Sequence, residues 1–191
     1  MSELPLIAVT DSATCPRPLA EQIERLAKLT ELRPQAVILR AKALDKAAYR
    51  TLALQAQQSC EAAGIPLILH SDWQLARELG ISMLHLPLAF LRQISEYERA
   101  YFTWLSTSVH SVGEAQEAQA LGATVLIAGH IYTTQCKAGL ARAPRLSAKR
   151  LQRCSLPVYA IGGIGFDAAQ HAELKANGAR GACVMSAYMR L

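Results

Sequence analysis

The stretch VGEAQEAQALGATVLIA, residues 112–128, carries the pattern that decides the fold. Its first part is polar and alanine-rich with helical periodicity, and after Gly122 the chain is almost wholly apolar over residues 124–128. A strand that is apolar at nearly every position is typical of a parallel sheet whose two faces are both covered. The stretch therefore predicts a helix that leads into a buried parallel strand.

The same pattern recurs along the whole chain. Apolar runs rich in Val, Ile and Leu give eight candidate strands, at residues 6–9, 36–39, 67–69, 83–86, 102–105, 124–128, 158–161 and 181–185. Polar segments with helical periodicity lie between them, at residues 18–32, 44–63, 73–79, 112–121 and 166–176. Gly64, Gly80, Gly122 and Gly178 each follow a helical segment, where a left-handed residue commonly ends a helix.

Strands that alternate with helices predict a parallel α/β fold. Eight such units in 191 residues indicate a compact (β/α)8 TIM barrel that forms one domain over residues 1–191. An open doubly wound sheet is the structural alternative, because the number of strands alone does not exclude it. Only residues 187–191 remain after Ser186, too few for a full closing helix. We therefore expect a truncated C-terminal helix and a barrel face that is either bare or covered by a partner subunit in a homodimer.

The composition is that of a well-cored globular protein, with 51% hydrophobic and 18% charged residues. The formal net charge is +5, but the 20 Lys and Arg residues are scattered and no basic run is interleaved with aromatic residues. Nucleic-acid binding is therefore not predicted, and the mild positive excess fits the capture of a phosphorylated metabolite. The five widely spaced cysteines include no C-x-x-C pair, which argues against disulfides and zinc. With no leader-like start and no apolar run of membrane-spanning length, we expect a cytoplasmic protein that does not bind membranes.

Polar residues follow most of the predicted strands, where a TIM barrel carries its active site. The residues in these positions are Thr10, Asp11, Arg40, Lys42, His70, Ser71, Asp72, His85, Pro87, Ser108, His110, Gly129, His130, Gly162, Gly163 and Ser186. Imidazole can both take and give a proton near pH 7. His110 and His130 follow two successive strands, so proton transfer is the first chemistry to expect.

Two glycines after the seventh strand form a candidate phosphate site. Gly162 and Gly163 come before a helix and leave backbone N–H groups open to an anion. Together with Ser186 and Ala187 after the eighth strand, they match the phosphate cup of TIM barrels. The alternative is that the glycines only form a tight turn.

Arg40 and Lys42 lie two residues apart at the end of the second strand, so both side chains point to one side if the strand continues. They could clamp a carboxylate or phosphate, or remain a solvated strand end. Asp11 and Asp72 are too few carboxylates for an octahedral magnesium site. We therefore predict no metal site.

The remaining histidines and one cysteine leave alternatives open. His130 could be a buried histidine bonded to a backbone carbonyl instead of a proton carrier. His85 lies inside its strand and is expected to be a buried structural residue, whereas His171 is expected to be solvated on its helix. Cys136 has only Lys137 as a nearby activator in the sequence, so we expect a loop residue and not a nucleophile.

Several of these elements resemble the thiamin phosphate synthase and TenI superfamily of small TIM barrels. The first matching motif is A-V-T-D at residues 8–11, and L-R-A-K at residues 39–42 corresponds to the family's L-R-E-K element. The last matching motifs are I-G-G-I at residues 161–164 and V-M-S at residues 184–186. The resemblance covers nearly the whole chain.

The motifs that differ between synthases and the TenI branch indicate to which of these two branches of the superfamily the chain is more similar. Thiamin phosphate synthases carry an N-D pair after strand three and a G-Q-x-D element after strand four, and these aspartates hold magnesium. The aligned residues here are His70-Ser71 and P-L-A-F at residues 87–90, so both magnesium carboxylates are missing. Where synthases read G-P after strand six, this chain has Gly129-His130. It resembles the TenI branch, the thiazole tautomerases, in its G-H, C-K-x-G-L and S-V-H-S elements and its leucine-proline pair at residues 86–87.

The TenI resemblance implies a cofactor-independent tautomerase that aromatises the carboxythiazole phosphate intermediate of thiamin biosynthesis. It assigns proton transfer to His130, and it places the remaining site residues around a small phosphorylated thiazole. These are Arg40, Lys42, Ser108, His110 and Lys137 for substrate contacts, and Gly162, Gly163, Ser186 and Ala187 for the phosphate. Two alternatives remain: a magnesium-dependent thiamin phosphate synthase, and a non-catalytic regulatory barrel that binds the phosphorylated ligand.

Overall fold

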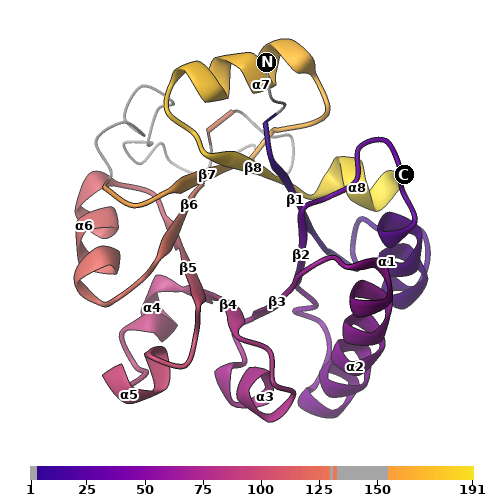
Figure 1. Ribbon diagram of the computed structural model, residues 1–191, viewed down its shortest axis with the longest axis horizontal. Helices are drawn as coiled ribbons and strands as arrows, with labels where there is room; N and C mark the ends of the chain where they lie inside the picture. The colour runs from indigo at the N-terminus through magenta and orange to yellow at the C-terminus, as the bar shows by residue number, and fades with distance from the viewer. Residues whose placement is uncertain (1–3, 130, 133–154) are drawn as a thin grey trace. The chain divides into compact units, whose positions relative to one another are not determined.

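The computed structural model describes residues 4–129, 131–132 and 155–191. Eight parallel strands alternate with helices, and the strand order from β1 to β8 closes into a barrel (Figure 1). This is the (β/α)8 TIM-barrel class that the sequence predicts, and the closed order excludes the open doubly wound sheet.

The chain divides into two compact units. One consists of Leu6–His85 and Val184–Leu191 and is named the β1–β3 unit here; the other consists of Met1–Pro5 and Leu86–Cys183 and is named the β5–β7 unit. That all 191 residues form a single domain stays a prediction.

The β1–β3 unit contains three complete strands and the start of a fourth. The strands are β1 (Leu6–Val9), β2 (Ala36–Leu39), β3 (Leu67–His70) and β4 (Met83–Pro87), which continues into the other unit. Every residue of β1 and β2 is buried, as expected for parallel strands covered on both faces. The register pairs Val9 with Ile38 and Leu39 with Leu69, so the carboxyl ends of β1, β2 and β3 lie next to one another.

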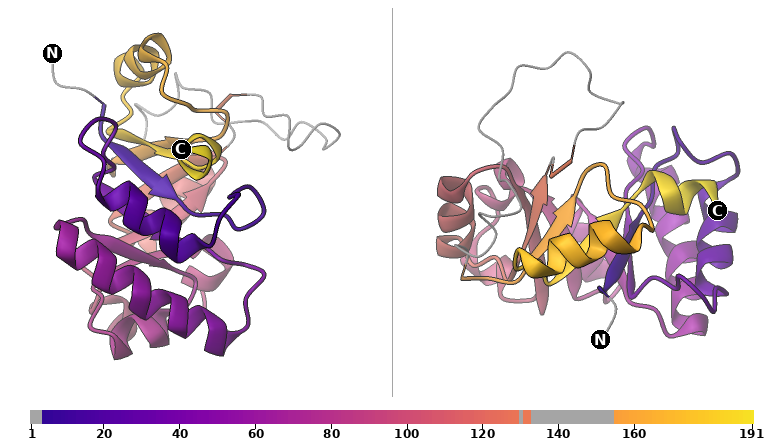
Figure 2. Two further views of the ribbon diagram at one scale, coloured as in Figure 1. Left: turned by 90° about the vertical axis from the view of Figure 1, so that its right-hand side faces the viewer. Right: turned by 90° about the horizontal axis from the view of Figure 1, so that it is seen from above.

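Three helices of this unit follow its strands, α1 (Leu19–Ala27), α2 (Lys46–Ala63) and α3 (Trp73–Glu78). Figure 2 shows α1 and α2 side by side, and the two helices are in contact. The Asp45 carboxylate accepts a hydrogen bond from Ala48 N–H and begins α2, which ends at Gly64 with φ +64°. Gly80, Gly122 and Gly178 have positive φ after their helices as well, which confirms the expected left-handed helix ends.

The residues after β8 (Gly181–Val184) form a five-residue helix, α8 (Ser186–Arg190). The truncated helix is therefore confirmed, but the side chains of Tyr188 and Met189 within it are fully buried. The Gln22 side-chain amide donates to the Tyr188 carbonyl at 2.5 Å, and the Tyr188 hydroxyl donates to the Leu32 carbonyl at 2.9 Å. The short helix packs against its own unit, and the homodimer stays a prediction.

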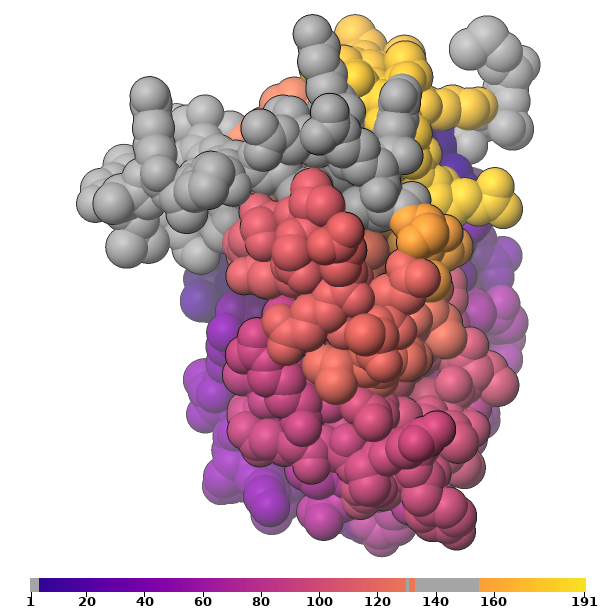
Figure 3. All heavy atoms as spheres, turned by 90° about the vertical axis from the view of Figure 1, so that its left-hand side faces the viewer, coloured from indigo at the N-terminus to yellow at the C-terminus, as the bar shows by residue number. Residues whose placement is uncertain are grey.

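The β5–β7 unit contains β5 (Trp104–Val109), β6 (Val125–Gly129) and β7 (Val158–Ile161), followed by most of β8. Its helices are α4 (Leu88–Leu91), α5 (Glu96–Arg99), α6 (Val112–Ala120) and α7 (Ala168–Ala176). Figure 3 shows the surface of α4 to α6 in pink to salmon. The Arg92 guanidinium, directly after α4, binds both carboxylate oxygens of Glu117 on α6.

The fifth strand differs from the prediction. We expected it at residues 102–105, and it lies at Trp104–Val109 instead. Ser106 and Thr107 are fully buried inside this strand, so their hydroxyl groups hid it from a search for apolar runs. No helix within the described residues is both long and apolar enough to cross a bilayer.

Candidate active site

The predicted site residues fall into both units and partly outside the described residues. Arg40, Lys42, Ser186 and Ala187 belong to the β1–β3 unit, and Ser108, His110, Gly162 and Gly163 belong to the β5–β7 unit. His130, Cys136 and Lys137 lie outside the described residues, so their expected roles stay predictions.

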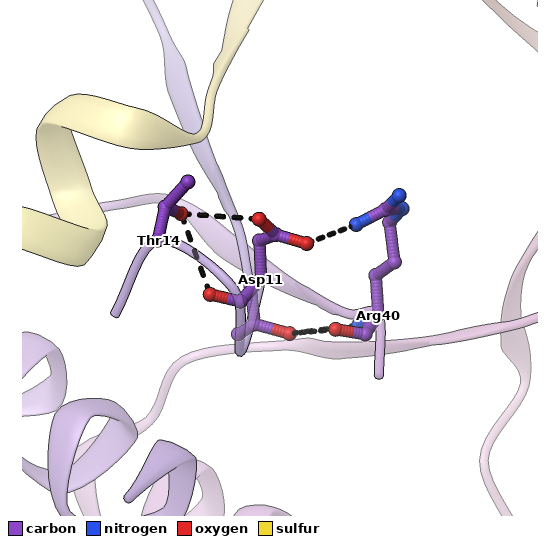
Figure 4. Close-up of polar contacts among 4 residues, drawn as sticks. Asp11, Thr14 and Arg40 are labelled. Carbon is purple, nitrogen blue, oxygen red and sulfur yellow. Dashed lines mark hydrogen bonds and ion pairs between the residues drawn. The ribbon is translucent and has the colours of Figure 1, made fainter. Parts of the chain in front are cut away.

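Arg40 is held at the carboxyl end of β2 by the end of β1 (Figure 4). Its guanidinium pairs with the Asp11 carboxylate, and the Thr14 hydroxyl donates to the other Asp11 oxygen at 3.1 Å. The Thr10 hydroxyl accepts from Arg40 N–H at 2.8 Å and donates to the Arg40 carbonyl at 2.9 Å. The Arg40 side chain is only 25% exposed, so it is a fixed cation and not the freely solvated strand end of the alternative hypothesis.

Lys42 is not arranged as the sequence suggested. The argument that placed it beside Arg40 required β2 to continue, and β2 ends at Leu39. Ala41 is buried and Lys42 is exposed in the turn that follows. The strand alternation that would direct the Arg40 and Lys42 side chains to one side is therefore missing.

Half-buried His70 and buried His85 form a ring pair to which the sequence assigned no joint role. Their ring centroids lie 5.3 Å apart, with His70 at the end of β3 and His85 in the middle of β4, and the register places the two residues opposite each other. Burial lowers the pKa of His70 to about 4, assisted by the positive charges of Arg40 and Lys42. Burial and the neighbouring His70 lower the pKa of His85 to about 3. Both imidazoles are therefore neutral near pH 7, and the prediction of a buried His85 is confirmed.

Backbone strain accompanies this pair. Ser71 has φ +71°, a left-handed conformation that is uncommon for a residue with a side chain, and its hydroxyl lies 2.7 Å from Nδ1 of His70. The buried Tyr49 hydroxyl of α2 accepts from His70 N–H at 3.1 Å and donates to the Leu39 carbonyl at 2.8 Å. The positive φ of Ser71 is not visible in hydrophobic periodicity, which is why the His70–Ser71 contact was missed.

Within the described part of the chain, the residues do not fit the magnesium site that the resemblance implies for a synthase. At the two positions that the resemblance matches to the synthase aspartates stand Ser71 and Phe90, and neither has a carboxylate. The Asp72 carboxylate accepts from Leu75 N–H at 2.9 Å and so begins α3, while Asp11 is paired with Arg40. Among the residues that the structure describes, no three His, Cys, Asp or Glu side chains are grouped so that they could hold a metal ion.

His110 follows β5 and is fixed from two directions. One Glu114 carboxylate oxygen accepts from His110 N–H at 2.6 Å and lies 3.5 Å from Nδ1 of the same residue. The other side of the ring faces Gly129, the last residue of β6, where a Cβ atom would lie 3.0 Å from Nε2. Ser108 is half-buried in β5 opposite Ile127 of β6.

Gly162 and Gly163 both have positive φ, +110° and +69°, directly after β7. The Gly162 carbonyl accepts from Tyr132 N–H at 3.1 Å, and the Gly163 carbonyl accepts from the Gln170 side chain at 2.9 Å. With both carbonyls bonded within the chain, the turn is well fixed. The phosphate role of this turn stays a prediction, as does that of Ser186 and Ala187, which begin α8.

His171 differs from its prediction. It lies on α7 as expected, but its Nε2 is 2.8 Å from the Gly165 carbonyl and its side chain is half-buried. It therefore binds the turn before α7 and is not a solvated residue of the helix surface.

A family model described as thiamine monophosphate synthase matches residues 6–188. The chain belongs to this family. A thiamine-phosphate synthase from Listeria monocytogenes serotype 4b (strain F2365) is 35% identical to this family member over 147 residues, which cover 74% of this chain and 67% of the relative. One from Desulfitobacterium hafniense (strain Y51) is 32% identical over 158 residues, which cover 79% of this chain and 73% of the relative.

Two solved structures share the fold of this thiamine monophosphate synthase family member. The thiamine phosphate pyrophosphorylase from Pyrococcus furiosus matches with a TM-score of 0.76 and 23% identity, over 98% of this chain and 88% of its own. FabK from Thermotoga maritima matches with a TM-score of 0.71 and 16% identity, over 97% of this chain and 59% of its own. The expected superfamily is thus confirmed, while the names of the relatives favour the synthase over the TenI branch.

Proposed function

We propose that this member of the thiamine monophosphate synthase family is a metal-independent thiazole tautomerase. One observation carries the proposal: Ser71 and Phe90, which have no carboxylate, stand at the positions that the resemblance matches to the magnesium aspartates of synthases. A leaving pyrophosphate would therefore lack its main electrostatic stabiliser. A proton shift that aromatises a ring has no such leaving group and needs mainly positioning and acid–base help.

In this proposal the substrate is a carboxythiazole phosphate in its unaromatised form. The proton at ring C2 is removed, the electron pair of that bond enters the ring, and the exocyclic carbon of the ylidene chain is protonated. His130 is assigned to this proton transfer. The turn at Gly162 and Gly163, with Ser186 and Ala187, is assigned to the phosphate.

Arg40 is assigned to the substrate carboxylate. Its pairing with Asp11, and the bonds of Thr10 to its main chain, fix the guanidinium before a ligand arrives. A planar guanidinium offers paired N–H donors to a carboxylate, which adds orientation to charge attraction. Ser108, Lys42 and Lys137 are assigned to further substrate contacts.

Thiamine-phosphate synthase is the second candidate function. It is favoured by the relatives of that name, which are 32–35% identical to this chain. It would join a hydroxymethylpyrimidine pyrophosphate to the thiazole phosphate with the help of magnesium.

The test is to follow ring absorbance when the purified protein meets the unaromatised substrate, with added Mg²⁺ and with a chelator. We expect equal rates in both conditions, and a rate lower by about 10² to 10⁴ in a His130→Asn variant, the usual contribution of general acid–base help. A wild-type rate in that variant would remove His130 from the mechanism. Pyrophosphate release that depends on Mg²⁺ would establish the synthase instead, and tight binding of the thiazole phosphate without either reaction would indicate a binding protein.

A further inference from the structure

We infer that His70 binds the ligand carboxylate together with Arg40, and that Ser71 positions the His70 ring for this contact. The inference rests on the proposed function and deepens it, because the sequence assigned His70 no ligand contact. His70, Ser71 and Arg40 all lie in the β1–β3 unit.

The main chain places Arg40 and His70 level with each other at the carboxyl ends of two neighbouring strands. Leu39 of β2 is paired with Leu69 of β3, and Arg40 and His70 are the residues that follow this pair. Adjacent strands lie about 4.8 Å apart, so side chains from both positions can reach one carboxylate. The Tyr49 hydroxyl fixes this spacing, since it donates to the Leu39 carbonyl at 2.8 Å and accepts from His70 N–H at 3.1 Å.

The ring of His70 is held by a residue in a strained backbone conformation. Ser71 has φ +71°, its hydroxyl lies 2.7 Å from Nδ1 of His70, and its N–H donates to the His85 carbonyl at 2.9 Å. Glycine would adopt this φ without strain, so the backbone alone does not explain a serine at this position. The contact between its hydroxyl and Nδ1 does explain it. Strained residues of this kind cluster at ligand sites, where the strain serves to position a functional group.

The other ring nitrogen of His70, Nε2, is open to solvent. Trp104 Nε1 and Thr107 Oγ1 are the only buried side-chain nitrogen or oxygen atoms that have no hydrogen-bond partner among the described residues. Nε2 of His70 has no partner within this part of the chain either, yet it is not one of those buried atoms. A ligand can therefore reach Nε2, while Nδ1 is occupied by Ser71.

The protons of the ring can be arranged to suit a carboxylate. Burial, with the positive charges of Arg40 and Lys42, lowers the pKa of His70 to about 4, so the ring is neutral near pH 7. A neutral imidazole carries its proton on one nitrogen, and a carboxylate only accepts hydrogen bonds. Because the Ser71 hydroxyl can donate as well as accept, it donates to Nδ1 when a bound carboxylate requires the proton on Nε2.

Arg40 keeps donors for the same carboxylate. Its ion pair with Asp11 engages one guanidinium nitrogen, Nη1 (Figure 4). A guanidinium has five N–H donors on three nitrogens, so others remain for a ligand. Arg40 thus supplies the charge, and His70 supplies a second, neutral donor that fixes the orientation of the carboxylate.

Two probes isolate this contact: the carboxythiazole phosphate product, and the thiazole phosphate that lacks the carboxylate. Calorimetry gives the Kd of each, and the ratio of the two values measures the carboxylate preference of the protein. We expect His70→Leu to lower this preference about tenfold, because a hydrogen bond to a charged group is lost. His70→Gln should keep most of it, since the glutamine amide can donate from about the place of Nε2. The Kd of the thiazole phosphate should be unchanged in both variants.

Ser71→Gly tests the positioning role, and Leu32→Gly is its matched control. Leu32 and Ser71 are the two residues other than glycine that have positive φ in the described ranges, and Leu32 lies before β2, at the opposite end of that strand from Arg40. Both substitutions relieve backbone strain, but only Ser71→Gly removes the hydroxyl at Nδ1. We expect Ser71→Gly to lower the carboxylate preference about threefold or more, and Leu32→Gly to leave it unchanged.

Circular dichroism and thermal unfolding establish that each variant is folded. The inference is overturned if the wild type has no carboxylate preference or if folded His70→Leu keeps it. It is also overturned if ¹⁵N NMR of the complex with carboxythiazole phosphate places the only ring proton of His70 on Nδ1. Equal preferences in Ser71→Gly and Leu32→Gly would remove Ser71 from it. A wild type that prefers the carboxylate but does not convert the unaromatised substrate would overturn the proposed function alone.

Discussion

At the scale of single residues, the lowered pKa of His70 makes the stability of the folded protein depend on pH. A histidine whose pKa is lower in the folded protein than in the unfolded chain binds its proton less readily when folded. With an ordinary pKa of 6.5 and a folded pKa of about 4 for His70, the unfolded chain takes up a proton first as the pH falls. The free energy of unfolding therefore decreases between pH 6.5 and about 4, and is unaffected by this residue above that range.

We predict that a His70→Asn variant has a flatter pH dependence of stability than the wild type. Between pH 7 and 4.5 the wild type should lose about 2 kcal/mol more, because one pKa unit corresponds to about 1.4 kcal/mol. Urea unfolding at both pH values measures the difference. Equal losses in the two proteins would mean that His70 titrates normally in the folded chain.

At the scale of elements, the approach of β7 to β8 depends on one missing side chain. Gly181 is paired with Tyr159, and a Cβ atom at Gly181 would lie 2.3 Å from the Tyr159 ring and 2.7 Å from the Pro5 carbonyl. Neither neighbour moves easily, because the Tyr159 ring packs edge-on against Trp104 at 5.5 Å and the Pro5 carbonyl accepts from Ala182 N–H.

We expect Gly181→Ala to lower the free energy of unfolding by about 1 to 3 kcal/mol, the usual range for overpacking a core. Gly165→Ala is the matched control, since a Cβ atom there would have no neighbour within 4 Å. Chemical denaturation measures the free energy of unfolding of both variants. Equal values would show that β7 and β8 can move apart to make room for the added methyl group.

The bounds of some strands and helices could be predicted from the sequence, and those of others could not. β1, β2 and β7 were predicted with their observed bounds because all or nearly all of their side chains are buried and apolar. β5 was misplaced because Ser106 and Thr107 are buried polar residues. The two four-residue helices α4 and α5 were missed because each is too short to show helical periodicity.

At the scale of the whole molecule, the sequence predicted the barrel class and the strand ends at which polar residues gather. It did not predict which contacts those residues make. The Asp11–Arg40 pair, the Ser71–His70 contact and the Glu114–His110 contact all depend on local backbone direction. Periodicity records burial but not the direction of a turn, so these contacts required the structure.

A ligand test applies to the whole chain. A thiazole phosphate that binds only the folded protein should raise the free energy of unfolding by about 2.7 kcal/mol at a concentration one hundred times its Kd. For a protein of this size each kcal/mol raises Tm by about 2 to 4 °C. We expect the same rise in Tm with Mg²⁺ or with a chelator, measured by differential scanning calorimetry. A rise that requires Mg²⁺ would favour the synthase.

The hydroxyl of Tyr49 affects how the ends of β2 and β3 respond to substitutions in helix α2. It bonds the last residue of β2 and the last residue of β3, yet it belongs to helix α2 on the outside of those strands. The outer helix is thereby tied to the main chain next to Arg40 and Ser71. We therefore expect substitutions on the far face of α2 that tilt the helix to move the ends of β2 and β3 together, because the Tyr49 hydroxyl is bonded to both.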